Sequence, residues 1–174
     1  MKGNRYIRQA LALVVVLLSM PIFHSCGIYS FSGTSIQPGI RTVSIDLFEY
    51  KALRVNPTLA SEMTEGIKDK FRKMTKLEQV DMDGDLEIVG SITGYDVRAT
   101  AVTSGEVAAQ NRLTVSISIK YTNRRYPDED FEKSFSAYAD YPSEQSLDSV
   151  ESSLCEEIVE QLCEQVLNAT VANW

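Results

Sequence analysis

Four segments of the chain alternate between apolar and polar residues, which is the pattern of a β-strand with one buried face. The predicted strands cover residues 42–47, 86–95, 113–121 and 131–141. In the first strand, Val43, Ile45 and Leu47 form the apolar face. In the second, Gly90 and Gly94 predict a bulge or the close packing of a helix. A loop at 98–110 and a turn at 123–130 join the last three strands, which predicts an antiparallel meander.

Two further segments carry apolar residues at helical spacing and predict amphipathic helices. The first covers residues 57–75 and begins at Asn56–Pro57, because asparagine accepts from the free amides of a first turn and proline has no amide there. Its apolar stripe consists of Leu59, Met63, Ile67, Phe71 and Met74. The second helix follows Pro142–Ser143 and ends near Thr170. Its apolar face combines Val150, Leu154, Ile158, Leu162 and Val166 with Cys155, Val159, Cys163, Leu167 and Val171.

The resulting element order is βαβββα, which predicts an α+β fold. We expect a two-layer sandwich in which two helices pack on one face of a four-stranded, mostly antiparallel sheet. Asp83–Gly84 predicts a tight turn that closes a short hairpin between residues 77–80 and the strand beginning at Leu86.

The first 26 residues carry an export signal. Lys2, Arg5 and Arg8 precede an apolar stretch at 10–23, which is the pattern of a secretory signal peptide. This stretch has 14 residues, whereas a helix needs about 20 to cross a bilayer. Phe23-His24-Ser25-Cys26-Gly27 then resembles a bacterial lipobox.

The lipobox resemblance implies that residues 1–25 are removed and that Cys26 becomes the lipid anchor. It would carry a covalent diacylglycerol and an N-acyl chain such as palmitate, which together anchor a protein stably. Residues 26–40 then form a lipidated tether, and 41–174 form a single α+β domain. Gly27, in place of an inner-membrane retention aspartate, implies the periplasmic face of the outer membrane. The alternative is an ordinary signal peptide followed by a buried free cysteine.

The charge of the chain excludes several functions. With 17 basic and 24 acidic residues its formal charge is −7, which disfavours binding of nucleic acid by bulk charge. Loss of residues 1–25 removes three bases and no acids, so the mature charge becomes −10. It also removes His24, the single histidine. Without histidine or a nucleophile motif, we predict no enzyme, no metal and no cofactor beyond the acyl groups. A hydrolase built on two buried carboxylates remains an alternative.

Two other features suggest sites but have simpler interpretations. Cys155 and Cys163 stand about 12 Å apart along one helix, beyond the roughly 7 Å limit for a disulfide, so we interpret them as small core residues. Residues 81–85 place aspartates at three alternate positions, like the start of a calcium loop. Leu86 and Ile92 stand where an EF-hand has glycine and glutamate, which favours a turn.

Several local sequences together resemble the LptE family of lipopolysaccharide-assembly lipoproteins, in the form found in Bacteroidetes. They are Cys26-Gly27-Ile28-Tyr29-Ser30-Phe31-Ser32-Gly33, Gly84-Asp85-Leu86, Gly90-Ser91-Ile92-Thr93-Gly94-Tyr95, Asn111-Arg112-Leu113-Thr114-Val115 and Val171-Ala172-Asn173-Trp174. The resemblance implies a non-catalytic outer-membrane protein of membrane biogenesis. It would plug the large β-barrel LptD, help that partner assemble, and assist lipopolysaccharide transport to the cell surface.

Direct contact with lipopolysaccharide would require a local basic patch, because a mature charge of −10 repels this anionic lipid. The candidate ligands lie near predicted strand ends and are Arg98, Arg112, Lys120, Arg124 and Arg125. The simpler interpretation is that these bases keep the strand ends soluble. The alternative function is a free-standing, periplasm-facing lipoprotein that binds a peptide or a cell-wall component.

Overall fold

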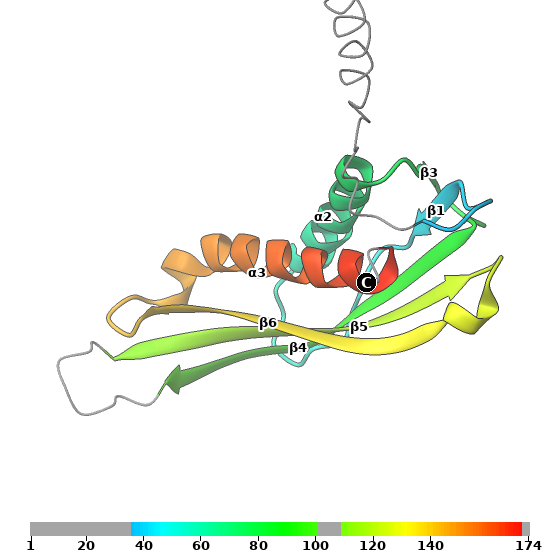
Figure 1. The fold of residues 1–174 in the computed structure, drawn as a ribbon. Coiled ribbons are helices and arrows are strands. Elements are labelled where there is room, and N and C mark those ends of the chain that lie inside the picture. The colour runs from blue at the N-terminus through cyan, green and yellow to red at the C-terminus, as the bar shows by residue number, and fades with distance from the viewer. Residues whose placement is uncertain (1–35, 101–108, 172–174) are drawn as a thin grey trace, which may run out of the picture. The chain divides into compact units, whose positions relative to one another are not determined.

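The strand with the clearest alternation, β5 (Gln110–Asn123), is central in the computed structural model, which describes residues 36–100 and 109–171. It pairs antiparallel with β4 (Leu86–Thr100) and with β6 (Phe131–Pro142), as Figure 1 shows. The meander is therefore confirmed, and a 3₁₀ turn at Pro127–Glu129 lies between β5 and β6. Both long strands extend beyond their predicted ends, so part of the predicted loop at 98–110 is strand.

The N-terminal half of the sheet differs from the prediction. β1 (Thr42–Ile45) runs parallel to β4 on one side and to β3 (Glu78–Val80) on the other. A two-residue strand, β2 (Glu49–Tyr50), also pairs parallel with β4. The sheet is thus mixed and six-stranded, with the order β3-β1-β4-β5-β6. The predicted four-stranded sheet and the hairpin of residues 77–80 with the next strand are wrong, because β1 lies between those two strands.

Leu47 is the residue for which the alternation gives the wrong face. β1 ends at Ile45, and Leu47 is 69% exposed. Phe48 takes the buried position instead and lies against Gly90, where an added Cβ would lie only 2.1 Å from the ring carbon Cζ. The close approach predicted at the glycines is therefore made by a phenylalanine ring, and the bulge lies between Ile92 and Gly94.

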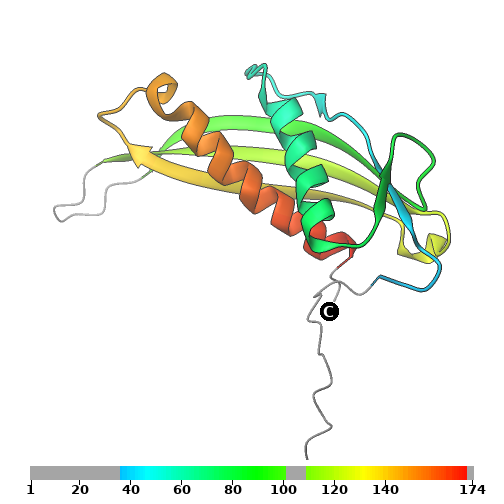
Figure 2. The same ribbon diagram turned by 90° about the horizontal axis from the view of Figure 1, so that it is seen from above.

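Two helices cover the same face of the sheet (Figure 2). α2 (Leu59–Met74) begins two residues later than predicted, but the Asn56 Oδ1 accepts from the amides of Thr58 and Leu59, at 3.1 Å each, as expected. Met74 is 47% exposed, so the buried stripe ends one turn earlier than predicted. α3 (Leu147–Thr170) buries both of its predicted stripes except for the half-buried Val150. Neither helix is long and apolar enough to span a membrane.

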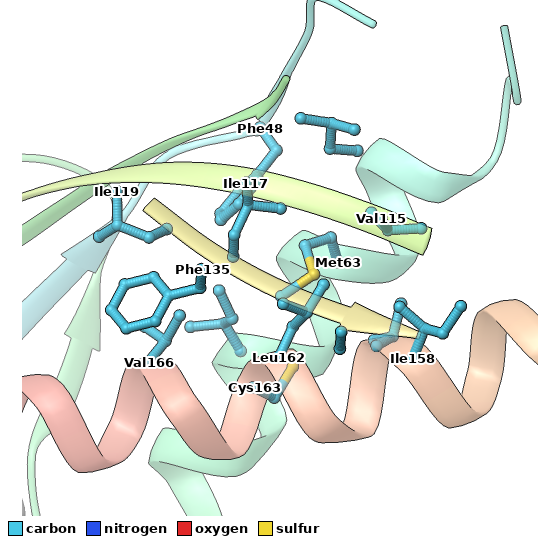
Figure 3. Packing of buried hydrophobic residues seen from close by; sticks show 14 of the residues in the cluster. Phe48, Met63, Val115, Ile117, Ile119, Phe135, Ile158, Leu162, Cys163 and Val166 are labelled. Atoms are coloured by element: carbon cyan, nitrogen blue, oxygen red, sulfur yellow. The ribbon is translucent and has the colours of Figure 1, made fainter. Parts of the chain in front are cut away.

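The core lies between the helices and the sheet (Figure 3). Ile117 and Ile119 of β5 point toward Leu162 and Val166 of α3, and all four are fully buried. The two-layer α+β architecture is therefore correct, and no helix within residues 36–100 and 109–171 covers the opposite face of β4, β5 and β6.

Candidate functional site: the helix-free face of the sheet

The helix-free face is the side of β4, β5 and β6 that points away from α2 and α3 (Figure 1). Strand alternation places every second side chain there, and the pairing register aligns these side chains into rows across the three strands. Two central rows carry small groups, Ser91 with Ser118 and Ser134, and Gly94 with Ser116 and Ser136. We call the serines of these two rows the hydroxyl strip.

The hydroxyl strip is uncharged, and its side chains can both donate and accept hydrogen bonds. The hydroxyl groups of Ser116 and Ser136 lie 2.8 Å apart, and Thr93 donates to the Ser116 carbonyl at 3.3 Å. Ser134 and Ser136 are exposed, and the serines on β4 and β5 are half-buried. A surface of this kind can pack closely against another polar surface, because its side chains are short.

A cationic group lies beyond the strip where β4 ends and β5 begins. The Arg112 guanidinium donates to both carboxylate oxygens of Asp140, at 2.7 and 2.8 Å. It also stacks over the Tyr138 ring, 3.6 Å from the centroid. The bond to Arg112 lowers the pKa of Asp140, and the same bond raises the pKa of Arg112. Arg98 faces Arg112 across the two strands and has no ion-pair partner within the described ranges.

The other three candidate bases lie at the opposite end of these strands. Arg124 binds Asp83 at 2.8 Å and Glu87 at 3.4 Å. Lys120 stands in a row between Val89 and Glu132. The structure therefore divides the five predicted ligands into two groups, and about 27 Å of extended chain separates Arg112 from Lys120, the nearest member of the other group. No described contact tests whether they bind lipopolysaccharide, so that assignment stays a prediction.

Arg125 belongs to a structural junction. It donates to Asp85 Oδ1 at 2.9 Å, while Asp85 Oδ2 accepts from the backbone amides of Arg41 and Thr42 at 2.8 and 3.2 Å. These bonds, with that to the Arg41 amide foremost, lower the pKa of Asp85 to about 2. The predicted turn at 81–85 thus fastens the start of β1. Across residues 36–100 and 109–171, no cluster of three or more metal-ligating side chains occurs.

The cysteine prediction is confirmed for both positions in α3. Cys155 and Cys163 are free and buried. Burial raises the pKa of the Cys155 thiol to about 11 and that of Cys163 to about 12, so both stay protonated. The side chains of Asn56 and Tyr95 approach the Cys155 sulfur at 3.7 and 4.0 Å. Cys26, the predicted lipid anchor, lies outside the described residues.

A hollow of about 520 Å³ is lined by the carboxylates of residues 128–130 and by the rings of Tyr121 and Phe131. The carboxyl groups with shifted pKa values are Asp85, Asp140 and Glu160, and all three are lowered, the opposite of what a general acid requires. Tyr95 bonds to Glu151 beneath α3, and Tyr121 stacks on Phe131. Tyr121 and Phe131 thus share the lining of that hollow, and Tyr95 lies outside it.

Sequence reasoning missed Tyr138 and Asp140 as part of this surface. The alternation of the predicted strand already placed both on its polar side, opposite Ala137 and Ala139. Their contact with Arg112 depends on the pairing register, which alternation within a single strand does not specify.

A family model described as LptE, lipopolysaccharide-assembly, matches residues 40–170. No curated protein matches the sequence. Among solved structures, a hypothetical protein of Chlamydia trachomatis is 9% identical with a TM-score of 0.51, covering 77% of this chain and 99% of that one. Rare lipoprotein B of Shewanella oneidensis is 12% identical with a TM-score of 0.45, covering 71% and 92%. A minor lipoprotein of Acinetobacter baumannii is 12% identical with a TM-score of 0.45, covering 70% and 91%.

Proposed function

Because the chain belongs to the LptE lipopolysaccharide-assembly family, we propose that it is a non-catalytic lipoprotein of the outer membrane that plugs an LptD-type β-barrel. It helps this barrel assemble and supports the passage of lipopolysaccharide to the cell surface. Acyl chains on Cys26 attach it to the periplasmic face of the membrane. The family match over residues 40–170 is the observation that carries this proposal.

The helix-free face supports the plug role on physical grounds. The lumen of a large outer-membrane barrel is polar and wet, so a protein inside it needs polar outer surfaces. The hydroxyl strip supplies such a surface, and its short side chains allow a barrel wall to approach the sheet closely. We therefore assign the helix-free face to the wall of the barrel.

Contact with lipopolysaccharide is proposed at the end of the sheet where Arg98 faces Arg112. Arg112 is already neutralised by Asp140, so Arg98 is the base there that is available for a phosphate. At the other end of the sheet, Arg124 and Arg125 form ion pairs with acids, so Lys120 is the candidate base that is available there for a phosphate. We expect Arg98→Glu to weaken lipopolysaccharide binding more than Arg124→Glu does.

The proposal is tested by purifying the tagged full chain from detergent-solubilised outer membranes. A photo-crosslinking residue at Ser116 probes the helix-free face, and one at Glu156, on the outer side of α3, is the matched control. We expect a large β-barrel protein in near-equimolar amount and a stronger crosslink from position 116 than from position 156. Recovery of the lipoprotein alone would overturn the plug role and favour the free-standing binding module.

The lipid anchor has a separate test. Cys26→Ala removes the thiol that carries the diacylglycerol, and we expect this variant to leave the membrane fraction while the parent chain stays in it. Equal membrane retention of the two chains would contradict the proposed anchor without bearing on the barrel partner.

A further inference from the structure

The hollow of about 520 Å³ lies beside the 3₁₀ turn at Pro127–Glu129, between the end of β5 and the start of β6. Its buried lining includes Leu86 and Val171, and its exposed lining carries the carboxylates of residues 128–130. Its described lining contains no lysine or arginine, and its volume is within the range of about 300 to 1,000 Å³ that is usual for ligand sites. We call it the acidic hollow, and we propose that it binds the guanidinium group of an arginine presented by the β-barrel partner.

Hydrogen bonds between segments distant in the sequence hold the walls of the acidic hollow in place. The side-chain amide of Gln37 donates to Glu129 Oε1. Asn123, which is fully buried, donates its side-chain amide to Glu129 Oε2 at 2.8 Å and its backbone amide to Asp130 Oδ1 at 2.7 Å. The site is therefore organised before a ligand arrives, which lowers the entropic cost of binding.

The acidic hollow has more hydrogen-bond acceptors than donors. Both oxygens of Glu129 are engaged, but the Asp128 carboxylate and Asp130 Oδ2 accept no hydrogen bond within the described residues. Gln37 Oε1 is buried and also has no partner there. The Gln37 amide cannot correct this by turning over, because its oxygen would then face the Glu129 carboxylate. A ligand that donates several hydrogen bonds would satisfy these acceptors.

The charge of the acidic hollow favours a cation. The carboxylates of residues 128–130 bring three negative charges to its lining. Burial raises the pKa of Tyr121 to about 12, and the carboxylates at 129 and 130 add to this rise. The neighbouring bases do not neutralise the site, since Arg125 already donates to Asp85 at 2.9 Å. Lys133 lines a separate groove beside α3.

The aromatic lining favours a guanidinium among the possible cations. The rings of Tyr121 and Phe131 are stacked, with their centroids 5.1 Å apart, and both line the acidic hollow. A guanidinium is flat, stacks on aromatic rings and donates in a fork that fits a carboxylate. A metal ion fits less well, because no group of three or more described side chains is placed to hold one.

The identity of the partner rests on the proposed plug role. The hydroxyl strip allows a barrel wall to approach closely, but it is uncharged and does not orient the plug electrostatically. A charged side chain that enters the acidic hollow fixes orientation and register, because a wrong contact would place like charges together. One arginine of the barrel would therefore supply the charged contact that the hydroxyl strip lacks.

The first test measures the acidic hollow in the detergent-solubilised full chain, without the barrel. N-acetyl-arginine amide is titrated by calorimetry, and we expect a dissociation constant of about 1 mM. N-acetyl-citrulline amide, which has nearly the same shape but no charge, should bind at least tenfold more weakly. No binding of the arginine probe up to about 10 mM, or equal binding of the two probes, would overturn the proposal.

Paired variants locate the probe. Asp128→Asn with Asp130→Asn should weaken arginine binding at least tenfold, and the fold should persist because asparagine keeps the oxygen that accepts from Asn123. Asp81→Asn with Asp96→Asn removes the same charge from exposed positions outside the hollow and should leave binding unchanged. Equal binding by both double variants would contradict the assigned site. Binding that appears only after deletion of residues 172–174 would also do so, because the chain itself would then be the occupant.

The second test identifies the source of the guanidinium. In purification from outer membranes, Asp128→Asn with Asp130→Asn should recover at least threefold less barrel protein than the parent, and the control double variant should recover as much as the parent. Equal recovery by all three chains would refute the arginine contact and leave the plug role intact. Recovery of no barrel by any chain, the parent included, would refute the plug role and the partner with it, and the titration separates that result from a failure of the hollow.

Discussion

The contact between Gly90 and Phe48 gives the sharpest stability prediction. An alanine Cβ at position 90 would lie 2.1 to 2.4 Å from three carbons of the Phe48 ring, whereas carbons in contact are about 3.5 to 4.0 Å apart. The ring must therefore move by more than 1 Å. Phe48 is 2% exposed, so it either strains the core or moves into water, at a cost of about 1 to 3 kcal/mol in either case. We expect Gly90→Ala to lower the free energy of unfolding by about 2 kcal/mol.

Urea unfolding followed by far-ultraviolet circular dichroism measures this loss. With a slope of about 2 kcal/mol per molar urea, the midpoint should fall by about 1 M. Gly94→Ala is the matched control, because it is the same change in the same strand, and its Cβ would lie 3.2 Å from the Ser116 side chain and 3.7 Å from Asp96 Oδ2. The control should change stability by less than about 1 kcal/mol.

A double-mutant cycle makes the reasoning refutable. Phe48→Ala alone should cost about 3 to 5 kcal/mol, because it leaves a cavity. Adding Gly90→Ala to that variant should cost almost nothing further, since the new methyl group enters the vacated space. Additive losses in the double variant, or a Gly90→Ala midpoint equal to that of Gly94→Ala, would show that the two residues do not pack as described.

Three further predictions concern single side chains. The pKa of Asp85 is lowered to about 2 from an unfolded value near 3.9, so its stabilisation is complete above about pH 4 and is lost toward pH 2. Asp85→Asn should lower the urea midpoint at pH 7, and the midpoint of this variant should decrease less between pH 4 and pH 2 than that of the parent. Asp83→Asn should change the midpoint little, because the side chain of Asp83 is 80% exposed. Asn56→Ala should cost about 1 kcal/mol of unfolding free energy, measured by thermal melting, because two amides of α2 lose their acceptor. Cys163, with a thiol pKa of about 12, should react with a thiol reagent at pH 8 only after unfolding, and rapid labelling of the native chain would contradict its burial.

The elements that the sequence predicts well are those whose signal is local. The alternation of Leu113 to Tyr121 and the apolar stripes of both helices require only periodicity, and the structure buries these residues except for Met74 and part of Val150. The start of α2 is equally local, because Asn56 caps amides two and three residues away. Such features depend on neighbouring residues and so can be recognised in a single sequence.

The misplaced elements depend on pairing between distant segments. β1 inserts between β3 and β4 because Asp85 binds the amides of Arg41 and Thr42, more than 40 residues earlier in the chain. The alternation of apolar and polar residues within one segment does not indicate such a contact between distant segments. The prediction that Leu47 is buried is wrong for a related reason. Phe48 takes the buried position instead, because Gly90 provides space for its ring. The same limit applies to the candidate site, where the alternation places Arg112 on the polar face but does not identify its partner Asp140.

The ion pairs of the basic residues limit how this acidic protein can bind an anionic lipid. Three of the five candidate ligands bind carboxylates at 2.7 to 2.9 Å, so each brings its own counter-charge to the surface. A phosphate that displaced Asp140 from Arg112 would leave that carboxylate unpaired beside it, which cancels much of the gain. The sheet therefore offers a lipid only a few separated bases, whereas the uncharged hydroxyl strip is continuous across three strands. This distribution favours contact with a protein wall over broad binding of a polyanion, and it limits any phosphate contact to bases such as Arg98 that have no ion-pair partner among the described residues.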